Sequence, residues 1–128
     1  MEEKSGLKNK LHQSEQWLRM LIDNTEDYAI FAVDTEGRIA TWNTGAEHLF
    51  GFEQAEMLGK EFSSIFTPED VQRRVPQEEI ERAQHEGYCP DVRWHKRKDG
   101  SRLFVSGSVR PLKDKEGKAH GFLIQPFA

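Results

Sequence analysis

The chain has 128 residues, a formal net charge of −4 and 31 % charged residues. This length suits one domain that buries a single core without disulfides or metal, and the acidic balance argues against nucleic-acid binding. The one cysteine, Cys89, excludes an internal disulfide framework and fits a reducing compartment.

The sequence shows no signal for membrane insertion or export. No apolar run approaches the ~20 residues that a membrane helix needs. The N-terminal residues also lack the apolar core of a signal peptide. We therefore expect a cytoplasmic protein, or a cytoplasmic piece of a longer one, without membrane contact.

Residues 1–24 predict an N-terminal amphipathic helix, separate from a second unit over residues 25–128. Its leucines recur at 4-7-3 spacing, which is an a/d seam interrupted at Ser14. These leucines are Leu7, Leu11, Leu18 and Leu21. Two interpretations stay open: a helix folded onto its own domain, or a short coiled coil that pairs two chains. We favour a homodimer paired through these leucines. A narrow apolar stripe on an otherwise charged helix is better matched to a single partner helix than to the broad surface of a domain core.

The next stretch predicts two short strands and a capped helix. Residues 28–33 form an apolar run that is rich in β-formers and too short for a helix. A turn of acidic residues and glycine separates this run from residues 38–42, which we expect to return as the hairpin partner. Asn43 or Thr44 then caps a helix, and Thr44 and Glu47 have the spacing of a capping box.

The middle of the chain predicts several short helices, and its last third predicts strands. Helical segments are expected at residues 53–58, 62–66, 67 onward and about 76–86. Extended runs with period two are expected at residues 91–98, 102–112 and 119–127. Strands divided by a helical block predict an α+β fold: a five-stranded antiparallel sheet with short helices packed on one face, preceded by the N-terminal helix. A small ligand would lie between the sheet and the helices.

Several motifs resemble those of a known family. They are Asp34-x-x-Gly37, Trp42-Asn43, Ala46-Glu47-x-Leu49-Phe50-Gly51-Phe52, Phe66-Thr67-Pro68-Glu69-Asp70, Lys98-Asp99-Gly100-Ser101 and Gly121-Phe122. In this order they resemble the PAS (Per-Arnt-Sim) sensory domain, and most of all the PAS modules of bacterial sensor histidine kinases. The likeness covers roughly residues 25–127. It implies a sheet of strand order 2-1-5-4-3, dimerisation through the N-terminal helix, and in many members a cofactor or metabolite inside.

The resemblance implies a regulatory domain and not an enzyme. The expected role is a sensory or interaction module in two-component signal transduction, which relays a ligand- or partner-induced change to an effector domain such as a histidine kinase. The residues agree, because the sequence contains no nucleophile–base spacing and no glycine-rich phosphate loop, and no catalytic residue is assigned. The alternatives are a ligand-free PAS dimerisation spacer and a haem-binding gas sensor.

The candidate ligand-binding residues are inward-facing positions of the predicted strands and helices. They are Phe31, Val33, Asn43, Leu49, Met57, Ile65, Ile80, Val105, Gly107, Phe122 and Ile124. Most of these residues are core by default and become pocket wall only if a void remains between them. For Asn43 we favour helix capping over ligand contact. Gly107 indicates a close approach to the backbone, by a ligand or by a neighbouring phenylalanine.

The identity of any cofactor stays open, although two are disfavoured. In light-oxygen-voltage members of the family a cysteine reacts with flavin, and the matching segment here, residues 59–64, has Phe62 in that position. Haem-binding members place a histidine on the helix before the third strand, where this sequence has only His85 at the helix end. A metal site made by His85, Cys89 and His95 is disfavoured by their irregular spacing, and we interpret the histidines as surface residues beside a strand.

Overall fold

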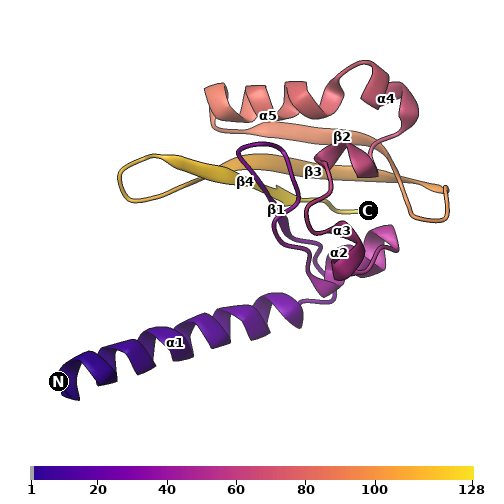
Figure 1. The fold of residues 1–128 in the computed structure, drawn as a ribbon. Coiled ribbons are helices and arrows are strands. Elements are labelled where there is room, and N and C mark those ends of the chain that lie inside the picture. Colours follow the sequence, from indigo (N-terminus) through magenta and orange to yellow (C-terminus); the bar gives the residue numbers. More distant parts are fainter. Residues whose placement is uncertain (1) are drawn as a thin grey trace.

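Helices and strands follow one another in blocks along the chain. The computed structural model describes residues 2–128, with side chains from residue 6 onward. The elements are α1 (Glu2–Asp23), β1 (Phe31–Asp34), α2 (Thr44–Phe50), α3 (Gln54–Met57), the 3₁₀ helix η1 (Phe62–Ile65), α4 (Pro68–Gln72), α5 (Val75–Glu86), β2 (Cys89–Lys96), β3 (Arg102–Lys113) and β4 (Ala119–Gln125). Figure 1 shows α4 and α5 covering one side of the sheet and α1 projecting away from it. The α+β class is as predicted. Of the predicted N-terminal unit, Met1 lies outside the described residues.

The strands form one antiparallel sheet in the order β1-β4-β3-β2. Phe31 of β1 lies opposite Ile124 of β4, and Val109 of β3 lies opposite the same residue on its other side. Side chains that point to the same face of neighbouring strands therefore meet in the core. The period-two pattern of the last third of the chain is confirmed, since all three extended runs are strands in this sheet.

The sheet has four strands, so the predicted five-stranded sheet of order 2-1-5-4-3 is wrong. Residues 38–42 join β1 through a single bridge between Val33 and Ile39. The Ile39 N–H donates instead to the Lys60 carbonyl at 2.8 Å, and the Ile39 carbonyl accepts from the Gly59 N–H at 2.8 Å. Because the backbone groups of this stretch are shared between β1 and the segment before η1, no regular ladder forms.

Asn43 caps α2, as one of the two predicted alternatives. Its side chain accepts a hydrogen bond from the backbone of the first turn at 2.9 Å, and Gly51 ends the helix with a left-handed φ of 82°. The predicted capping box of Thr44 and Glu47 is wrong, because the Thr44 hydroxyl donates to the carbonyl of Asp23. That bond ties the start of α2 to the end of α1.

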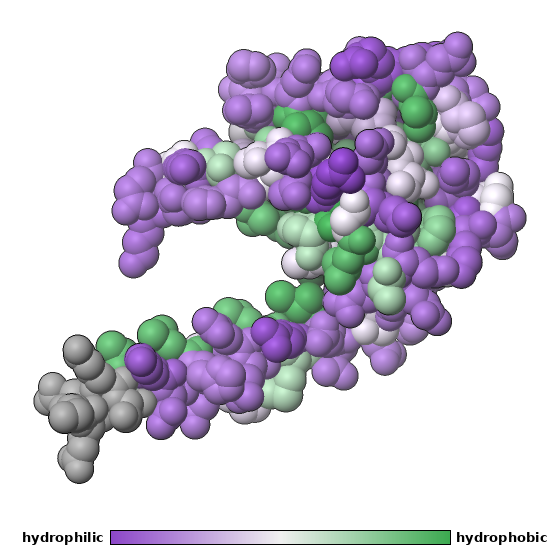
Figure 2. Space-filling view, viewed as in Figure 1, coloured by the Kyte–Doolittle hydropathy of each residue, from purple (hydrophilic) through white to green (hydrophobic). Residues whose placement is uncertain are grey.

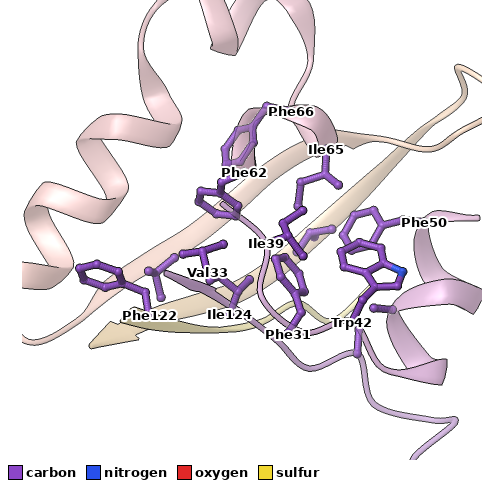
Figure 3. Packing of buried hydrophobic residues seen from close by; sticks show 14 of the residues in the cluster. Phe31, Val33, Ile39, Trp42, Phe50, Phe62, Ile65, Phe66, Phe122 and Ile124 are labelled. Carbon is purple, nitrogen blue, oxygen red and sulfur yellow. The ribbon is translucent and has the colours of Figure 1, made fainter. Parts of the chain in front are cut away.

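The core lies between the inner face of the sheet and the helices (Figure 3). Its largest fully buried side chains include Trp42, Phe31, Phe50, Phe66 and Met57. Burying such aromatic and aliphatic groups supplies most of the stabilisation of a domain of this size.

Helix α1 is exposed along its whole described length, residues 6–23. The four predicted seam residues Leu7, Leu11, Leu18 and Leu21 are 60 %, 58 %, 59 % and 61 % exposed. Figure 2 shows apolar side chains gathered along the edge of α1 that faces the rest of the molecule. Within residues 2–128 no helix is long and apolar enough to cross a membrane.

Candidate functional site

The interior positions predicted from the sequence come together between the sheet and the helices. The buried apolar members are Phe31, Val33, Met57, Ile65, Val105, Phe122 and Ile124, all in one cluster. Leu49 of α2 and Ile80 of α5 pack against this cluster and stay partly exposed. The predicted inward orientation is therefore confirmed, and the role of these residues as ligand contacts stays a prediction.

Four rings, which we call the aromatic cluster, fill the space beneath β1. They are Phe31, Trp42, Phe50 and Phe62. The Phe31 ring centroid lies 4.8 Å from Trp42, 6.4 Å from Phe50 and 6.2 Å from Phe62. The Trp42 N–H also donates to the Phe52 carbonyl at 2.9 Å. These contacts are typical of a close-packed core, so a ligand at this place would have to displace aromatic side chains.

The close approach predicted at Gly107 is made by backbone atoms that follow β4. A Cβ atom at Gly107 would lie 2.6 Å from the Gln125 carbonyl oxygen and 2.9 Å from the Pro126 Cα. Both distances are shorter than van der Waals contact, so a side chain here would push the end of β4 away. Glycine at this position is thus explained by chain packing alone.

The side-chain amide of Asn43 joins three segments of the chain. Its Oδ1 accepts from the N–H groups of Ile30 and Ala46, both at 2.9 Å. Its Nδ2 donates to the carbonyls of Thr25 at 3.3 Å and Tyr28 at 2.8 Å. These four bonds use the full capacity of an amide side chain. Asn43 therefore fixes the segment between α1 and β1 against the first turn of α2.

Two open hollows lie at the surface of the domain. One, of about 290 Å³, lies between the turn after β1, the start of η1 and α5, and is lined by Phe62 and Ile80 together with Glu36, Glu61 and Glu81. The other, of about 340 Å³, is lined by residues of the α1–β1 connection, α2 and the last three residues. The predicted site residues that reach a hollow are Ile80 in the first and Leu49 in the second.

The sequence did not reveal that His95 of β2 is buried, and its interpretation as a surface residue is wrong. Its side chain is 1 % exposed, with Nδ1 2.9 Å from the Ile65 carbonyl oxygen and Nε2 2.5 Å from Asp91 Oδ2. A carbonyl oxygen can only accept, so Nδ1 carries a proton and donates it. The second ring nitrogen contacts the Asp91 carboxylate, which therefore holds the imidazole in place from the side of β2.

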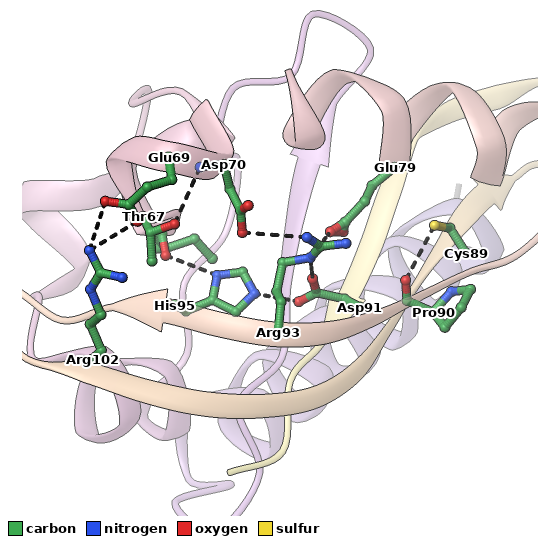
Figure 4. Close-up of polar contacts among 11 residues, drawn as sticks. Thr67, Glu69, Asp70, Glu79, Cys89, Pro90, Asp91, Arg93, His95 and Arg102 are labelled. Atoms are coloured by element: carbon green, nitrogen blue, oxygen red, sulfur yellow. Dashed lines mark hydrogen bonds and ion pairs between the residues drawn. The ribbon is translucent and has the colours of Figure 1, made fainter. Parts of the chain in front are cut away.

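Arg93 extends this arrangement from β2 to two helices (Figure 4). Its Nε donates to Asp91 Oδ1 at 2.9 Å, and its Nη1 donates to Asp70 Oδ2 of α4 at 3.4 Å. The same Nε lies 3.2 Å from Glu79 Oε1 of α5. We call the five residues Asp70, Glu79, Asp91, Arg93 and His95 the buried polar network.

The pKa values of the Glu79 and Asp91 carboxyl groups are shifted in opposite directions. Burial, followed by the hydrogen bond to Asp91 and its charge, raises the pKa of Glu79 to about 10. Burial also acts to raise the pKa of Asp91, but hydrogen bonds from His95 and Glu79 and the charges of His95 and Arg93 outweigh it, so this pKa is lowered. At neutral pH Glu79 therefore keeps its proton and Asp91 carries the negative charge.

An inverted strand pattern explains why the buried polar network was missed. Asp91, Arg93 and His95 alternate along one face of β2, while Val92 and Trp94 on the other face are 54 % and 52 % exposed. Apolar residues usually mark the inward face of a strand, and here they mark the outward one. The available signal was the period-two spacing of an acid, an arginine and a histidine.

Among the side chains that the structure describes, from residue 6 to residue 128, no group of three metal-binding residues could hold an ion. Of the three residues weighed for a metal site, His85 is exposed, Cys89 is buried, and His95 is bonded to Asp91 and Ile65.

A family model described as the PAS fold matches residues 18–125. The chain belongs to the PAS family. The PAS domain is a regulatory and sensory fold that is not itself catalytic, and this PAS domain is a sensory signalling module.

Curated relatives of this PAS domain are much longer proteins. Two-component system protein A of Emericella nidulans is 38 % identical over 94 residues, which are 73 % of this chain and 14 % of that protein. Cell-division control histidine kinase PdhS of Brucella ovis is 37 % identical over 68 residues, which are 53 % of this chain and 6 % of that protein. The chain thus spans a small fraction of the length of either relative.

Solved PAS structures share the fold at low sequence identity. The PAS domain of a protein from Colwellia psychrerythraea has a TM-score of 0.78 at 21 % identity, covering 88 % of this chain and 93 % of that one. A domain of a sensory box sensor histidine kinase/response regulator from Geobacter sulfurreducens has a TM-score of 0.74 at 19 % identity, covering 92 % and 96 %. These similarities establish the architecture alone.

The interior of this PAS domain offers poor support for haem or for a flavin–cysteine adduct. The buried residues of α5 are Pro76, Glu79 and Ala83, whereas His85 lies in the exposed last turn. The position expected for a flavin-reactive cysteine is Phe62, which belongs to the aromatic cluster. The residues present therefore do not fit either group.

Proposed function

We propose that this PAS domain is a dimeric sensory module that relays a ligand- or partner-induced change to an effector domain of the same cytoplasmic signalling protein, such as a histidine kinase. Its relatives named above belong to two-component signalling and are several times longer than this chain. The observation that carries this proposal is the exposed apolar face of α1, a helix whose C-terminal end is bonded to the domain.

The composition of α1 supports pairing with a second copy. Leu7, Leu11, Leu18 and Leu21 expose apolar surface on a helix whose other residues are mostly polar or charged. Burying one leucine side chain contributes roughly 1.5–3 kcal/mol, so a seam of four leucines per chain favours association. A parallel pair of α1 helices would bring the two domains side by side.

The connection between α1 and the domain supports a relay of change in either direction. Asn43 holds the carbonyls of Thr25 and Tyr28, and Thr44 holds the carbonyl of Asp23. A displacement of α2 is therefore transmitted to the end of α1 through hydrogen bonds. A ligand that binds one arrangement of the α1 pair better than another would shift the two populations by its difference in affinity.

Replacing two leucines of α1 tests the proposed dimer. We expect Leu11→Ala with Leu18→Ala to weaken self-association at least about tenfold in sedimentation experiments, because both large side chains leave the seam. Asn9→Ala with Gln16→Ala, on the opposite side of the heptad, is the control and should leave association unchanged. Unchanged association of the leucine variant would contradict pairing through α1.

A ligand-free dimerisation spacer is the second candidate function, favoured by the dense aromatic cluster between sheet and helices. Native mass spectrometry of the purified protein separates the two candidates, because a copurifying small molecule supports a sensor with its own ligand. An absorption spectrum tests the third alternative, a haem-binding gas sensor, which requires a Soret band.

A further inference from the structure

Helix α5 covers the edge strand β2 with little apolar contact. Its buried residues are Pro76, Glu79 and Ala83, and Val75 and Ile80 pack partly buried at the edge of the core. An element that buries so few apolar groups opens at lower free energy than the strands beneath it. The main polar group that α5 presents to β2 is the carboxyl of Glu79 (Figure 4).

Both ends of α5 have left-handed backbone conformations. Arg74 at the N-terminal end has a φ of 62° and is the only described residue other than glycine with a positive φ. Gly87 ends the helix with a φ of 80°. Left-handed conformation is unfavourable for arginine, so the surrounding contacts must maintain it. The chain thus changes direction sharply on both sides of α5.

The hydrogen-bond geometry requires a proton on Glu79 while α5 is closed. Both oxygens of Asp91 are occupied, one by His95 and the other by Arg93. The Nε hydrogen of Arg93 is directed to Asp91, and neither oxygen of Glu79 accepts a hydrogen bond from a described protein donor. Its one cationic neighbour, Arg93 Nε at 3.2 Å, donates to Asp91 instead, so an ionised Glu79 would be buried without a donor, and protonation removes that cost.

We propose that α5 is a proton-coupled flap over β2, which keeps Glu79 protonated while closed and releases that proton to water when it opens. The step is a simple acid dissociation, in which the carboxyl O–H bond breaks and the proton passes to solvent. The flap is independent of the pairing of α1, and it would let the state of α5 report on pH as well as on any ligand.

The sign of the pH effect follows from the carboxyl group. In the closed flap the pKa of Glu79 is about 10, and in an open, solvated flap it returns towards 4.5. Between these values the closed state binds one more proton than the open state. Each rise of one pH unit therefore favours opening about tenfold.

The other groups around Glu79 do not reverse this sign. Asp91 stays ionised, because its pKa is lowered, and Arg93 stays protonated, because its pKa is raised. Asp70 lies on α4, and His95 is bonded to β2 and η1, so neither moves with α5. Burial raises the pKa of the Cys89 thiol, which favours its protonated form.

Hydrogen exchange of the backbone amides tests the flap, using the whole 128-residue chain between about pH 6 and pH 9. After correction for intrinsic rates, we expect the protection of α5 amides to fall about tenfold per pH unit and to remain below that of β3 amides. Glu79→Gln should abolish this pH dependence and raise α5 protection roughly a hundredfold at about pH 7, because the amide side chain has no proton to release. Glu78→Gln, on the exposed side of the same turn, should keep the wild-type behaviour.

Three outcomes would overturn the proposal. The first is α5 protection that does not depend on pH in the wild-type chain. The second is equal protection of α5 and β3, which would mean that only the whole domain unfolds. The third comes from infrared spectroscopy at about pH 8: a wild-type chain without the carboxylic-acid band that Glu79→Gln removes has no buried proton at this place.

Discussion

The two sides of the interior are built from different chemistry. Under β1 lies the aromatic cluster, and under β2 lies the buried polar network. They meet where the ring of Phe50 approaches His95, with centroids 6.1 Å apart. Apolar packing is non-directional and independent of protonation, whereas the network needs each proton and charge in place. The β1 side should therefore be robust to solution conditions, and the β2 side should respond to them.

The largest expected effect is on the β1 side. Phe31→Ala should lower the free energy of unfolding by about 3–5 kcal/mol at every pH, because it leaves a cavity in the middle of the aromatic cluster. Denaturant unfolding at several pH values measures this loss. Phe104→Ala, on the exposed face of β3, is the control and should cost less than about 1 kcal/mol. A loss at Phe31 that varies with pH would show that the aromatic cluster also depends on titrating groups.

On the β2 side, Asp91→Asn removes the anion that both Arg93 and His95 contact. We expect the free energy of unfolding to fall by about 3 kcal/mol at neutral pH, because the half-buried Arg93 and the buried His95 both lose the carboxylate that they contact. Denaturant unfolding measures the change, with Glu116→Gln in an exposed turn as the control. Wild-type stability in Asp91→Asn would show that the network contributes no more than a surface ion pair.

Asn43 is a polar residue on the β1 side, but its side chain carries no charge. Asn43→Ala should cost about 2 kcal/mol, because it leaves two backbone N–H groups and two carbonyls without their partner. The amide does not titrate, so we expect the same loss from acid to alkaline conditions in thermal or denaturant unfolding. The matched control is Asn24→Ala at the exposed end of α1, which should cost a few tenths of a kcal/mol.

The smallest expected effect, counted per pH unit, is the change that Glu79 causes in the free energy of unfolding. Its pKa is higher in the folded than in the unfolded protein, so the stability it gives is complete below 4.5 and is lost as the pH rises towards about 10. Between about pH 6 and pH 9 the free energy of unfolding should fall by up to about 1.4 kcal/mol per pH unit. Glu79→Gln should flatten this slope in denaturant unfolding, and Glu78→Gln should not. Equal slopes in all three proteins would place the responsible group elsewhere.

The sequence predicted the inward apolar positions well, but it did not predict the loss of the fifth strand beside β1 or the buried polar network under β2, for physical reasons. Inward positions such as Phe31, Phe122 and Ile124 follow the apolar period of a strand, which is a local signal. The predicted fifth strand does not form, because Ile39 exchanges backbone hydrogen bonds with residues about twenty positions away in the sequence. The orientation of His95 depended on where Asp91, Arg93 and the helices would meet, which no local period encodes.

The way residues 38–41 lie along β1 has a consequence for aggregation. The outward N–H of Ala32 donates to the Thr41 hydroxyl, and its carbonyl accepts from the Ala40 N–H. The N–H of Asp34 donates to the Arg38 carbonyl. Strand addition and amyloid-type growth need unpaired backbone groups at the edge of a sheet. At this edge, the N–H and carbonyl of Ala32 and the N–H of Asp34 are all paired. Another chain therefore cannot add a strand to the β1 edge at these positions, even though the sheet has no fifth strand to cover that edge.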